Sequence, residues 1–91
     1  MKQVSLSKFL KDKRESAGLS QKQVADKLGY TTPQFISNWE RGVSSPPLKT
    51  LKKVGELYHV SADELFKVTL ESTLQQVTMD LKRKFYGRKA V

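Results

Sequence analysis

Apolar residues recur along this chain at the three- and four-residue spacing of amphipathic helices, and no run alternates with period two as in a strand. The first such segment covers about residues 6–17, and Gly18 provides its stop. Its apolar face is formed by Leu6, Phe9, Leu10 and Ala17. Arg14 falls on the same face, so its guanidinium must either extend to solvent or pair with a buried acid.

Two short helices are predicted next, close together in the chain. The first begins at Ser20, which forms a capping box with the Gln three residues later, and ends at Gly29. The second has Thr32 as its N-cap and Pro33 as its first helical residue, and Gly42 closes it. Only about three residues would then separate the two helices. A link this short makes them cross steeply, which indicates a helix-turn-helix unit.

Two further helices complete the pattern. One follows Pro47, with Gly55 as a weak point and with four apolar residues expected to be buried: Leu48, Leu51, Val54 and Tyr58. The other begins near Ala62 after a second capping box at Ser61, and no Gly or Pro interrupts it as far as Tyr86. Five capped helices around one core predict an all-α fold.

The third predicted helix has two contrasting sides. At about 100° per residue, Phe35, Ile36 and Trp39 share the apolar side, with Glu40 at its margin. The opposite side carries no carboxylate, and its members are Gln34, Ser37, Asn38 and Arg41. Gln and Asn can bond adenine N6 and N7, and Arg can bond guanine O6 and N7. Any soluble helix has a polar face, but this face beside a capped partner helix favours the reading of DNA.

Composition and charge agree with this interpretation. The 91 residues are enough for one domain, and 17 Lys and Arg against 9 Asp and Glu give a net charge of +8. Such a chain favours polyanions, with nucleic acid first and anionic membrane second. The first sixty residues hold +6, residues 61–81 hold −3 and the last ten hold +5. The basic end is either a solvated tail or an arm that adds phosphate contacts.

Several classes of function are disfavoured. The chain has no Cys and a single histidine, His59, so neither a disulfide nor a metal site is expected. It contains no phosphate-binding glycine loop and no nucleophile motif, so we expect no enzyme activity and no cofactor. No apolar run approaches the roughly 18 residues of a membrane span. A cytoplasmic protein without a membrane partner is therefore expected.

Two segments carry a resemblance to a known family. Residues 19–29 (LSQKQVADKLG) and 36–42 (ISNWERG) resemble the core of the lambda-repressor-like, or Cro-type, helix-turn-helix regulators. Residues 60–66 (VSADELF) resemble the start of that family's fifth helix. The resemblance covers about residues 5–67. It implies a five-helix DNA-binding domain over residues 1–67, followed by a C-terminal helical extension with a basic tail over residues 68–91.

The resemblance also implies roles for single residues. Gln21 would touch the DNA backbone and brace the recognition helix, and Arg14 would pair with Glu40. Base reading would fall on Thr32, Pro33, Gln34 and Asn38. This turn is one residue longer than the common pattern, with Tyr30 as the addition. Since Pro33 cannot donate a hydrogen bond, we expect it to start the helix and at most to touch a thymine methyl.

Backbone contacts that position the protein without reading sequence are expected from groups around the recognition helix. These are Lys22, Thr31, Thr32, Arg41 and Ser44.

The last third of the chain holds four apolar residues at 4-3-4 spacing, namely Leu70, Leu74, Val77 and Leu81. They either fold back onto the core or form the interface of a homodimer, and a dimer would read two half-sites about 34 Å apart. We therefore predict a homodimeric regulator of bacterial or phage origin, associated with the nucleoid. It would act as a repressor or autoregulator that places helix 33–41 in the major groove of a palindromic double-stranded operator. The alternative is an antitoxin or adaptor whose residues 68–91 bind a partner protein.

Overall fold

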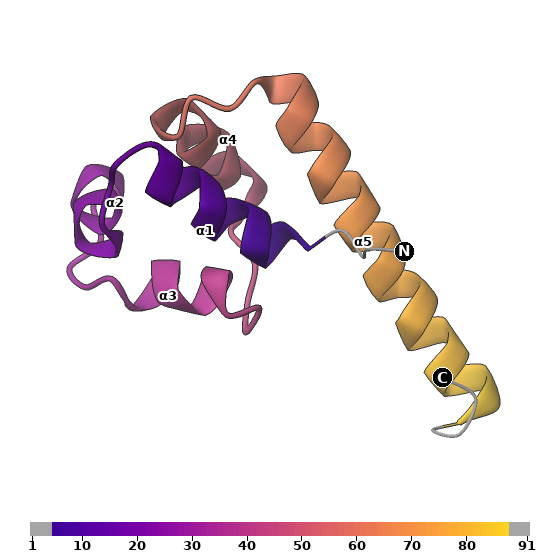
Figure 1. Cartoon of the computed structure of the whole chain (residues 1–91). Coiled ribbons are helices and arrows are strands. Elements are labelled where there is room, and N and C mark those ends of the chain that lie inside the picture. The colour runs from indigo at the N-terminus through magenta and orange to yellow at the C-terminus, as the bar shows by residue number, and fades with distance from the viewer. Residues whose placement is uncertain (1–4, 88–91) are drawn as a thin grey trace.

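The computed structural model describes residues 5–87, and within this range it contains helices and no strand, so the predicted all-α class is confirmed. The helices are α1 (Leu6–Ser16), α2 (Gln21–Leu28), α3 (Gln34–Glu40), α4 (Leu48–Leu57) and α5 (Ala62–Tyr86). Helices α1 to α4 form a body, and α5 starts against it and then runs away from it (Figure 1). Arg88 and Lys89, two cations of the expected basic tail, lie outside the described residues.

The core draws on all five helices. Its buried side chains are Leu10, Val24, Ala25, Ile36, Trp39, Leu51, Val54, Tyr58 and Leu65. Within α3 and α4 the buried residues lie three apart, Ile36 with Trp39 and Leu51 with Val54, because that spacing repeats on one face of an α-helix. The charged residue Arg14 is buried with them, and the side chain of Glu40 is only 4% exposed.

The ends of α2 follow the predicted signals. Ser20 Oγ accepts the N–H of Gln23 at 3.0 Å, and the Gln23 side chain accepts the N–H of Ser20 at 2.8 Å. This reciprocal pair satisfies two N–H groups that the helix itself leaves unbonded. Gly29 ends the helix with φ of 85°, a left-handed conformation that glycine adopts without steric cost.

The predicted start of α3 was one residue too early. The carbonyl of Pro33 accepts the N–H of Ser37 at 3.0 Å, which makes Pro33 the N-cap and Gln34 the first helical residue. Thr32 still has a capping role, since its Oγ1 accepts the N–H of Gln34 at 3.3 Å. The helix ends at Glu40, so the expected recognition helix 33–41 is shorter at both ends, and five residues rather than three separate α2 from α3.

Two residues expected in the core lie at the surface. Phe35 is 52% exposed: it lies in the first turn of a two-turn helix, and its ring packs beside that of Tyr30 with 4.8 Å between the centroids. Leu48 is 74% exposed, because as the first residue of α4 it borders an open groove instead of the core.

Gly55 has a packing role that the sequence did not indicate. A Cβ there would lie 2.8 Å from a methyl group of Leu65, so glycine lets α5 approach α4 closely.

Helix α5 continues through residues 67 and 68 without a break, across the boundary expected between the domain and its extension. Its first turns pack on the body through Leu65, which is buried. The four apolar residues further along do not fold back onto the core. Leu70, Leu74, Val77 and Leu81 are all exposed on the single chain.

Candidate nucleic-acid interface

Helix α3 is held at the surface of the body by its apolar side. Ile36 is fully buried and Trp39 is 4% exposed, so this side of the helix faces α1 and α2. The opposite side is therefore turned outward over its full length of two turns. It presents the predicted polar set, of which Gln34 and Arg41 are exposed and Ser37 and Asn38 are half-buried.

Hydrogen bonds link these four polar side chains into one surface. Gln34 Nε2 donates to Asn38 Oδ1 at 3.0 Å, one helical turn further along. Arg41 Nη2 donates to the same Asn38 Oδ1 at 2.6 Å, and Arg41 Nε donates to Ser37 Oγ at 3.2 Å. The side chains on this face therefore hold one another in place, with Asn38 at the centre.

The position of Arg41 determines how both amides are oriented. A guanidinium can only donate, so the Asn38 atom that faces it must be the carbonyl oxygen. Because that oxygen also faces Gln34, Gln34 must present its NH₂ group to Asn38. The Gln34 oxygen and the Asn38 NH₂ group are left as the acceptor and the donor that this face can offer to base edges.

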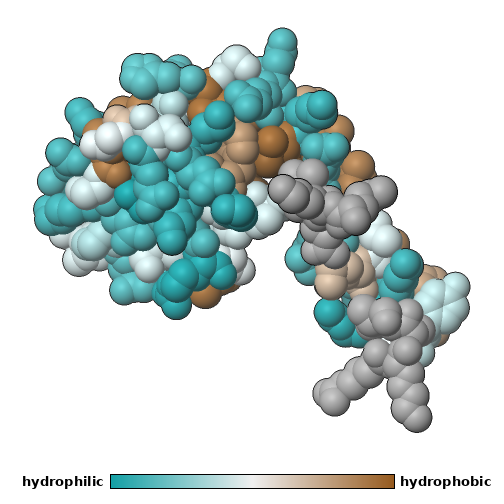
Figure 2. Space-filling model, viewed as in Figure 1, coloured by the Kyte–Doolittle hydropathy of each residue, from teal (hydrophilic) through white to brown (hydrophobic). Residues whose placement is uncertain are grey.

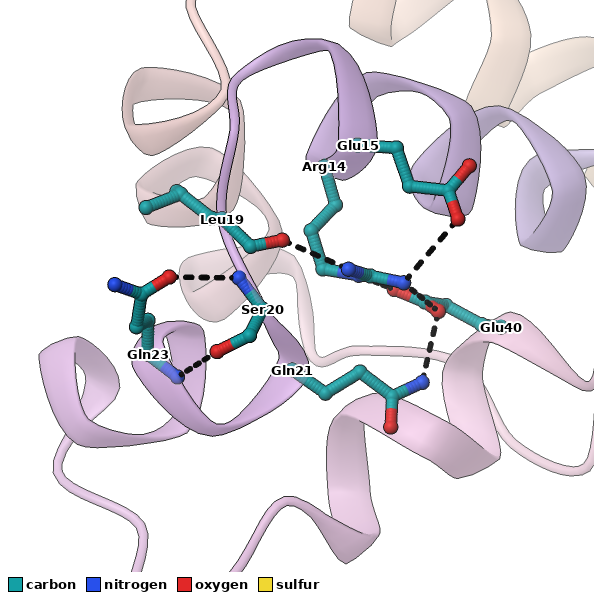
Figure 3. A network of polar contacts seen from close by, with 7 residues as sticks. All are labelled: Arg14, Glu15, Leu19, Ser20, Gln21, Gln23 and Glu40. Atoms are coloured by element: carbon teal, nitrogen blue, oxygen red, sulfur yellow. Dashed lines mark hydrogen bonds and ion pairs between the residues drawn. The ribbon is translucent and has the colours of Figure 1, made fainter.

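Beneath this surface, a buried ion pair fixes α3 to α1 (Figure 3). Arg14 Nε donates to Glu40 Oε2 at 2.6 Å and Arg14 Nη2 donates to Glu40 Oε1 at 3.1 Å. The two side chains are 10% and 4% exposed, so water screens the pair little. Arg14 Nη1 also donates to the carbonyl of Leu19 at 2.8 Å, which attaches the chain between α1 and α2. Each of the three guanidinium nitrogens of Arg14 thus donates a hydrogen bond.

Gln21 connects the start of α2 to the same carboxylate. Its Nε2 donates to Glu40 Oε1 at 2.9 Å, so Glu40 accepts from α1 and α2 together (Figure 3). The last residue of α3 is therefore held in place by both neighbouring helices.

The buried carboxylate of Glu40 also affects the pKa of two groups. The hydrogen bond from Arg14 to Glu40 raises the pKa of the guanidinium, against the opposing effect of burial. Burial, followed by the charge of Glu40, raises the pKa of the nearby Tyr58 phenol.

The residues expected to contact phosphates lie around α3. Thr31, Thr32 and Ser44 are exposed on the segments that enter and leave the helix, and Pro33, which was expected to start the helix and not to contact phosphate, is half-buried beside them. The N–H of Ser44 donates to the carbonyl of Asn38 at 3.4 Å, which places the loop after α3 beside the outward face.

Lys22 on α2 is also exposed, and it pairs with Asp26 at 2.7 Å. At 61% and 56% side-chain exposure this pair lies in water and is weak. Lys22 is therefore able to exchange its carboxylate for a phosphate.

The sequence did not indicate one surface feature close to α3. The rings of Tyr30 and Phe35 lie 4.8 Å apart at a 35° angle, and the ring of Tyr30 also meets that of Trp39 edge-on at 6.0 Å. Tyr30 thus fills the longer turn between α2 and α3 and links it to the core. In the sequence, only the aromatic character of Tyr30, the added turn residue, could have pointed to these ring contacts.

Residues 5–87 lack two other kinds of feature. No group of three or more His, Asp or Glu side chains lies close enough together there to hold a metal ion. In the same range no helix is both long enough and apolar enough to cross a membrane.

The comparison with known families matches a helix-turn-helix profile to residues 10–65, which is more than half of the chain. The chain belongs to the lambda-repressor-like helix-turn-helix family. The matched range contains the buried ion pair, the linked polar face of α3 and the start of α5.

Curated relatives from bacteria carry the same domain. The HTH-type transcriptional regulator ImmR of Bacillus subtilis is 44% identical over 62 residues, which cover 68% of this chain and 48% of ImmR. The SPbeta prophage-derived uncharacterized HTH-type transcriptional regulator YonR of the same organism is 45% identical over 66% of this chain and 55% of its own length. The HTH-type transcriptional activator BcrR of Enterococcus faecalis is 34% identical over 70% of this chain and 33% of BcrR. The chain thus spans about half, or less, of the length of these relatives.

Proposed function

We propose that this protein is a sequence-specific regulator of transcription that places α3 in the major groove of double-stranded DNA. The observation that carries the proposal is the outward face of α3, where Gln34, Asn38 and Arg41 are joined by hydrogen bonds and no carboxylate intervenes. A linked face of this kind presents hydrogen-bonding groups in fixed positions, which base recognition requires. The family membership supports it, since the relatives described above are named transcriptional regulators.

We further propose that the regulator acts as a homodimer on a palindromic operator, as a repressor or autoregulator in a bacterial or phage-infected cytoplasm. A helix of seven residues contacts only a few base pairs, so a single copy would discriminate poorly. The exposed apolar residues of α5 offer a surface on which two copies can pair. Two bodies bound over a promoter would exclude polymerase by their volume alone, which is sufficient for repression.

The experiment is a gel-shift titration of the purified protein on a site selected from random duplex DNA, repeated across a salt series. If each dimer neutralises roughly 6–10 phosphates, the slope of log affinity against log salt should be about −5 to −9. A random duplex of equal length is the control, and it should bind at least about a thousandfold more weakly. Equal affinity for both duplexes, or a slope near zero, would contradict the proposal.

The exposed apolar residues of α5 also favour a second function, the binding of a partner protein by residues 68–91 as in an antitoxin or adaptor. In that case the purified chain alone would stay monomeric. Sedimentation of the isolated protein at micromolar concentration separates the two functions, because only the first requires self-association.

A further inference from the structure

Helix α5 has two opposite faces. The face toward the body carries Leu65, which is buried, and Ser72 and Met79, which line a cavity together with residues of α1. The opposite face, at about 100° per residue, carries a stripe of large apolar side chains, each between 43% and 79% exposed. The outer stripe consists of Phe66, Leu70, Leu74, Val77, Leu81 and Phe85. In Figure 2, brown apolar patches are visible along the part of α5 that leaves the mostly teal body.

The spacing of the outer stripe is the same in both directions along the helix. The six residues follow one another at intervals of 4, 4, 3, 4 and 4. If a second α5 lies antiparallel, with a two-fold axis between residues 75 and 76, every stripe residue lies opposite another one. Phe66 then faces Phe85 of the second copy, and the inner residues form the pairs Leu70 with Leu81 and Leu74 with Val77.

A parallel arrangement would also bring apolar residues together, so the charges along α5 decide the direction. Residues 62–71 carry Asp63, Glu64 and Glu71 against Lys67, a net charge of −2. Residues 80–86 carry Asp80 against Lys82, Arg83 and Lys84, a net charge of +2. Two parallel helices would place like charges side by side, whereas two antiparallel helices place each acidic end beside a basic end.

The ion pairs that α5 already makes do not remove the difference in net charge between its two ends. Arg83 lies 3.4 Å from Asp80, and Glu64 lies 3.7 Å from Lys13 of α1. The four side chains are 37% to 53% exposed, so both pairs are solvated and weak. The ends of α5 therefore keep their charge for a partner.

We propose that the outer stripe docks against the α5 of a second copy of this chain in antiparallel orientation. This proposal rests on the homodimer of the proposed function and specifies its geometry. Phe66 belongs both to the outer stripe and to an apolar groove between α4 and α5, which Leu48, Leu51 and Val60 also line. The antiparallel register brings the C-terminal end of the second α5, with its exposed Phe85, to this groove. The stripe and the groove thus form one continuous apolar surface for the same partner.

The test uses the absence of cysteine from the chain, so that each single-cysteine variant has one thiol. Leu70→Cys and Leu81→Cys are purified separately, checked for helicity by circular dichroism, and oxidised alone or as an equimolar mixture. The antiparallel dimer predicts a mixed disulfide in the mixture and little disulfide dimer from either variant alone. Lys11→Cys, on the exposed side of α1, is the control for random collisions. Efficient disulfide dimers from each variant alone would indicate parallel helices and overturn the proposal.

A charge-reversal pair provides a second measurement that needs no cysteine. In the antiparallel register Glu71 lies within one turn of Lys82 of the second copy, whereas in one chain these residues are about 16 Å apart along the helix. Glu71→Lys or Lys82→Glu alone should weaken the dimer by about 10-fold in sedimentation equilibrium, because the dimer contains two such pairs. The double variant should restore the parent affinity.

Equal effects of single and double reversals, or a parent chain that stays monomeric, would overturn the proposal and leave the stripe to a different protein. Neither measurement uses DNA. A failure of DNA binding and a failure of antiparallel pairing are therefore distinguishable.

Discussion

Arg41 donates from Nη2 to Oδ1 of Asn38 across 2.6 Å, and this bond orients the amide that lies at the centre of the outward face of α3. With its oxygen engaged by Arg41 and by Gln34, Asn38 has only its two N–H donors available for DNA. In the major groove only guanine presents two adjacent acceptors, O6 and N7, whereas adenine N7 and thymine O4 are single acceptors. Asn38 is thus suited best to a guanine, whereas an unconstrained Asn would suit adenine best.

The substitution Asn38→Asp tests this orientation. Aspartate keeps an oxygen for Arg41 and for Gln34 but has no N–H to offer a base, so we expect discrimination to fall by about 1–3 kcal/mol at one base pair. Because the added charge also repels phosphate, the readout is the ratio of affinities for the selected site and for each of its single-base variants. Asn38→Ala should instead flatten the preference at more than one position, since Gln34 and Arg41 both lose their shared partner. Identical profiles for the two variants would contradict this role.

Substitutions of Gln34 and of Lys22 should weaken DNA binding in different ways. Gln34→Ala removes an exposed amide from the outward face and should weaken discrimination at one base pair by about 1–3 kcal/mol. Lys22→Ala removes a cation on α2 and should weaken binding to all sequences alike, with a salt slope smaller by about 1. Competition gel shifts with cognate and random duplexes measure both. A uniform loss on every duplex from Gln34→Ala would remove Gln34 from the base-reading set.

The buried pair of Arg14 and Glu40 should dominate the polar contribution to stability. Glu40→Ala leaves the Arg14 guanidinium buried without its carboxylate and frees Gln21, so we expect a loss of about 3–5 kcal/mol in the free energy of unfolding. The matched control is Asp12→Ala, which removes an exposed pair with Lys8 and should cost less than about 1 kcal/mol. Urea unfolding followed by circular dichroism measures both. Similar losses from the two variants would contradict the importance of burial.

The positions of the helices could be predicted because their signals are local. Ser20 with the Gln at its third helical position, and Gly29 after α2, act through bonds within one turn, and the structure contains both caps. The pairing of Arg14 was also accessible, since a cation on an apolar face requires a partner if it is buried. The start of α3 was harder, because Thr32 and Pro33 are both good starting residues and only the hydrogen bonds distinguish them.

The remaining features depend on distant residues or on rotamers. The exposure of Leu48 and the close approach of α5 at Gly55 follow from how α4 and α5 pack, which periodicity does not determine. The link from Gln34 through Asn38 to Arg41 joins residues three and four apart, so their proximity was predictable. Which atom each amide presents was not predictable, since it depends on the guanidinium that both amides share.

Tyr58 should make stability depend on alkaline pH. Burial raises the pKa of its phenol, with a further contribution from the charge of Glu40. Below about pH 10, the ordinary tyrosine pKa, folded and unfolded chains both keep the proton and the stabilisation is fully present. Above that pH the unfolded chain releases the proton while the folded chain retains it. Stability is therefore lost as the pH rises toward the folded pKa, by up to about 1.4 kcal/mol per pH unit.

The variant Tyr58→Phe isolates this contribution from the other groups that titrate at high pH. Its ring can occupy the same buried position, but it has no proton to lose. The free energies of unfolding of the parent and the variant, measured in urea at pH 7, 9, 10 and 11, should differ by a constant amount up to about pH 9. Above about pH 10 the parent should lose stability faster than the variant, because only the parent gains an ionised tyrosine on unfolding at this site. If the difference stays constant to pH 11, the Tyr58 phenol is not shielded by the core that holds α3 in place.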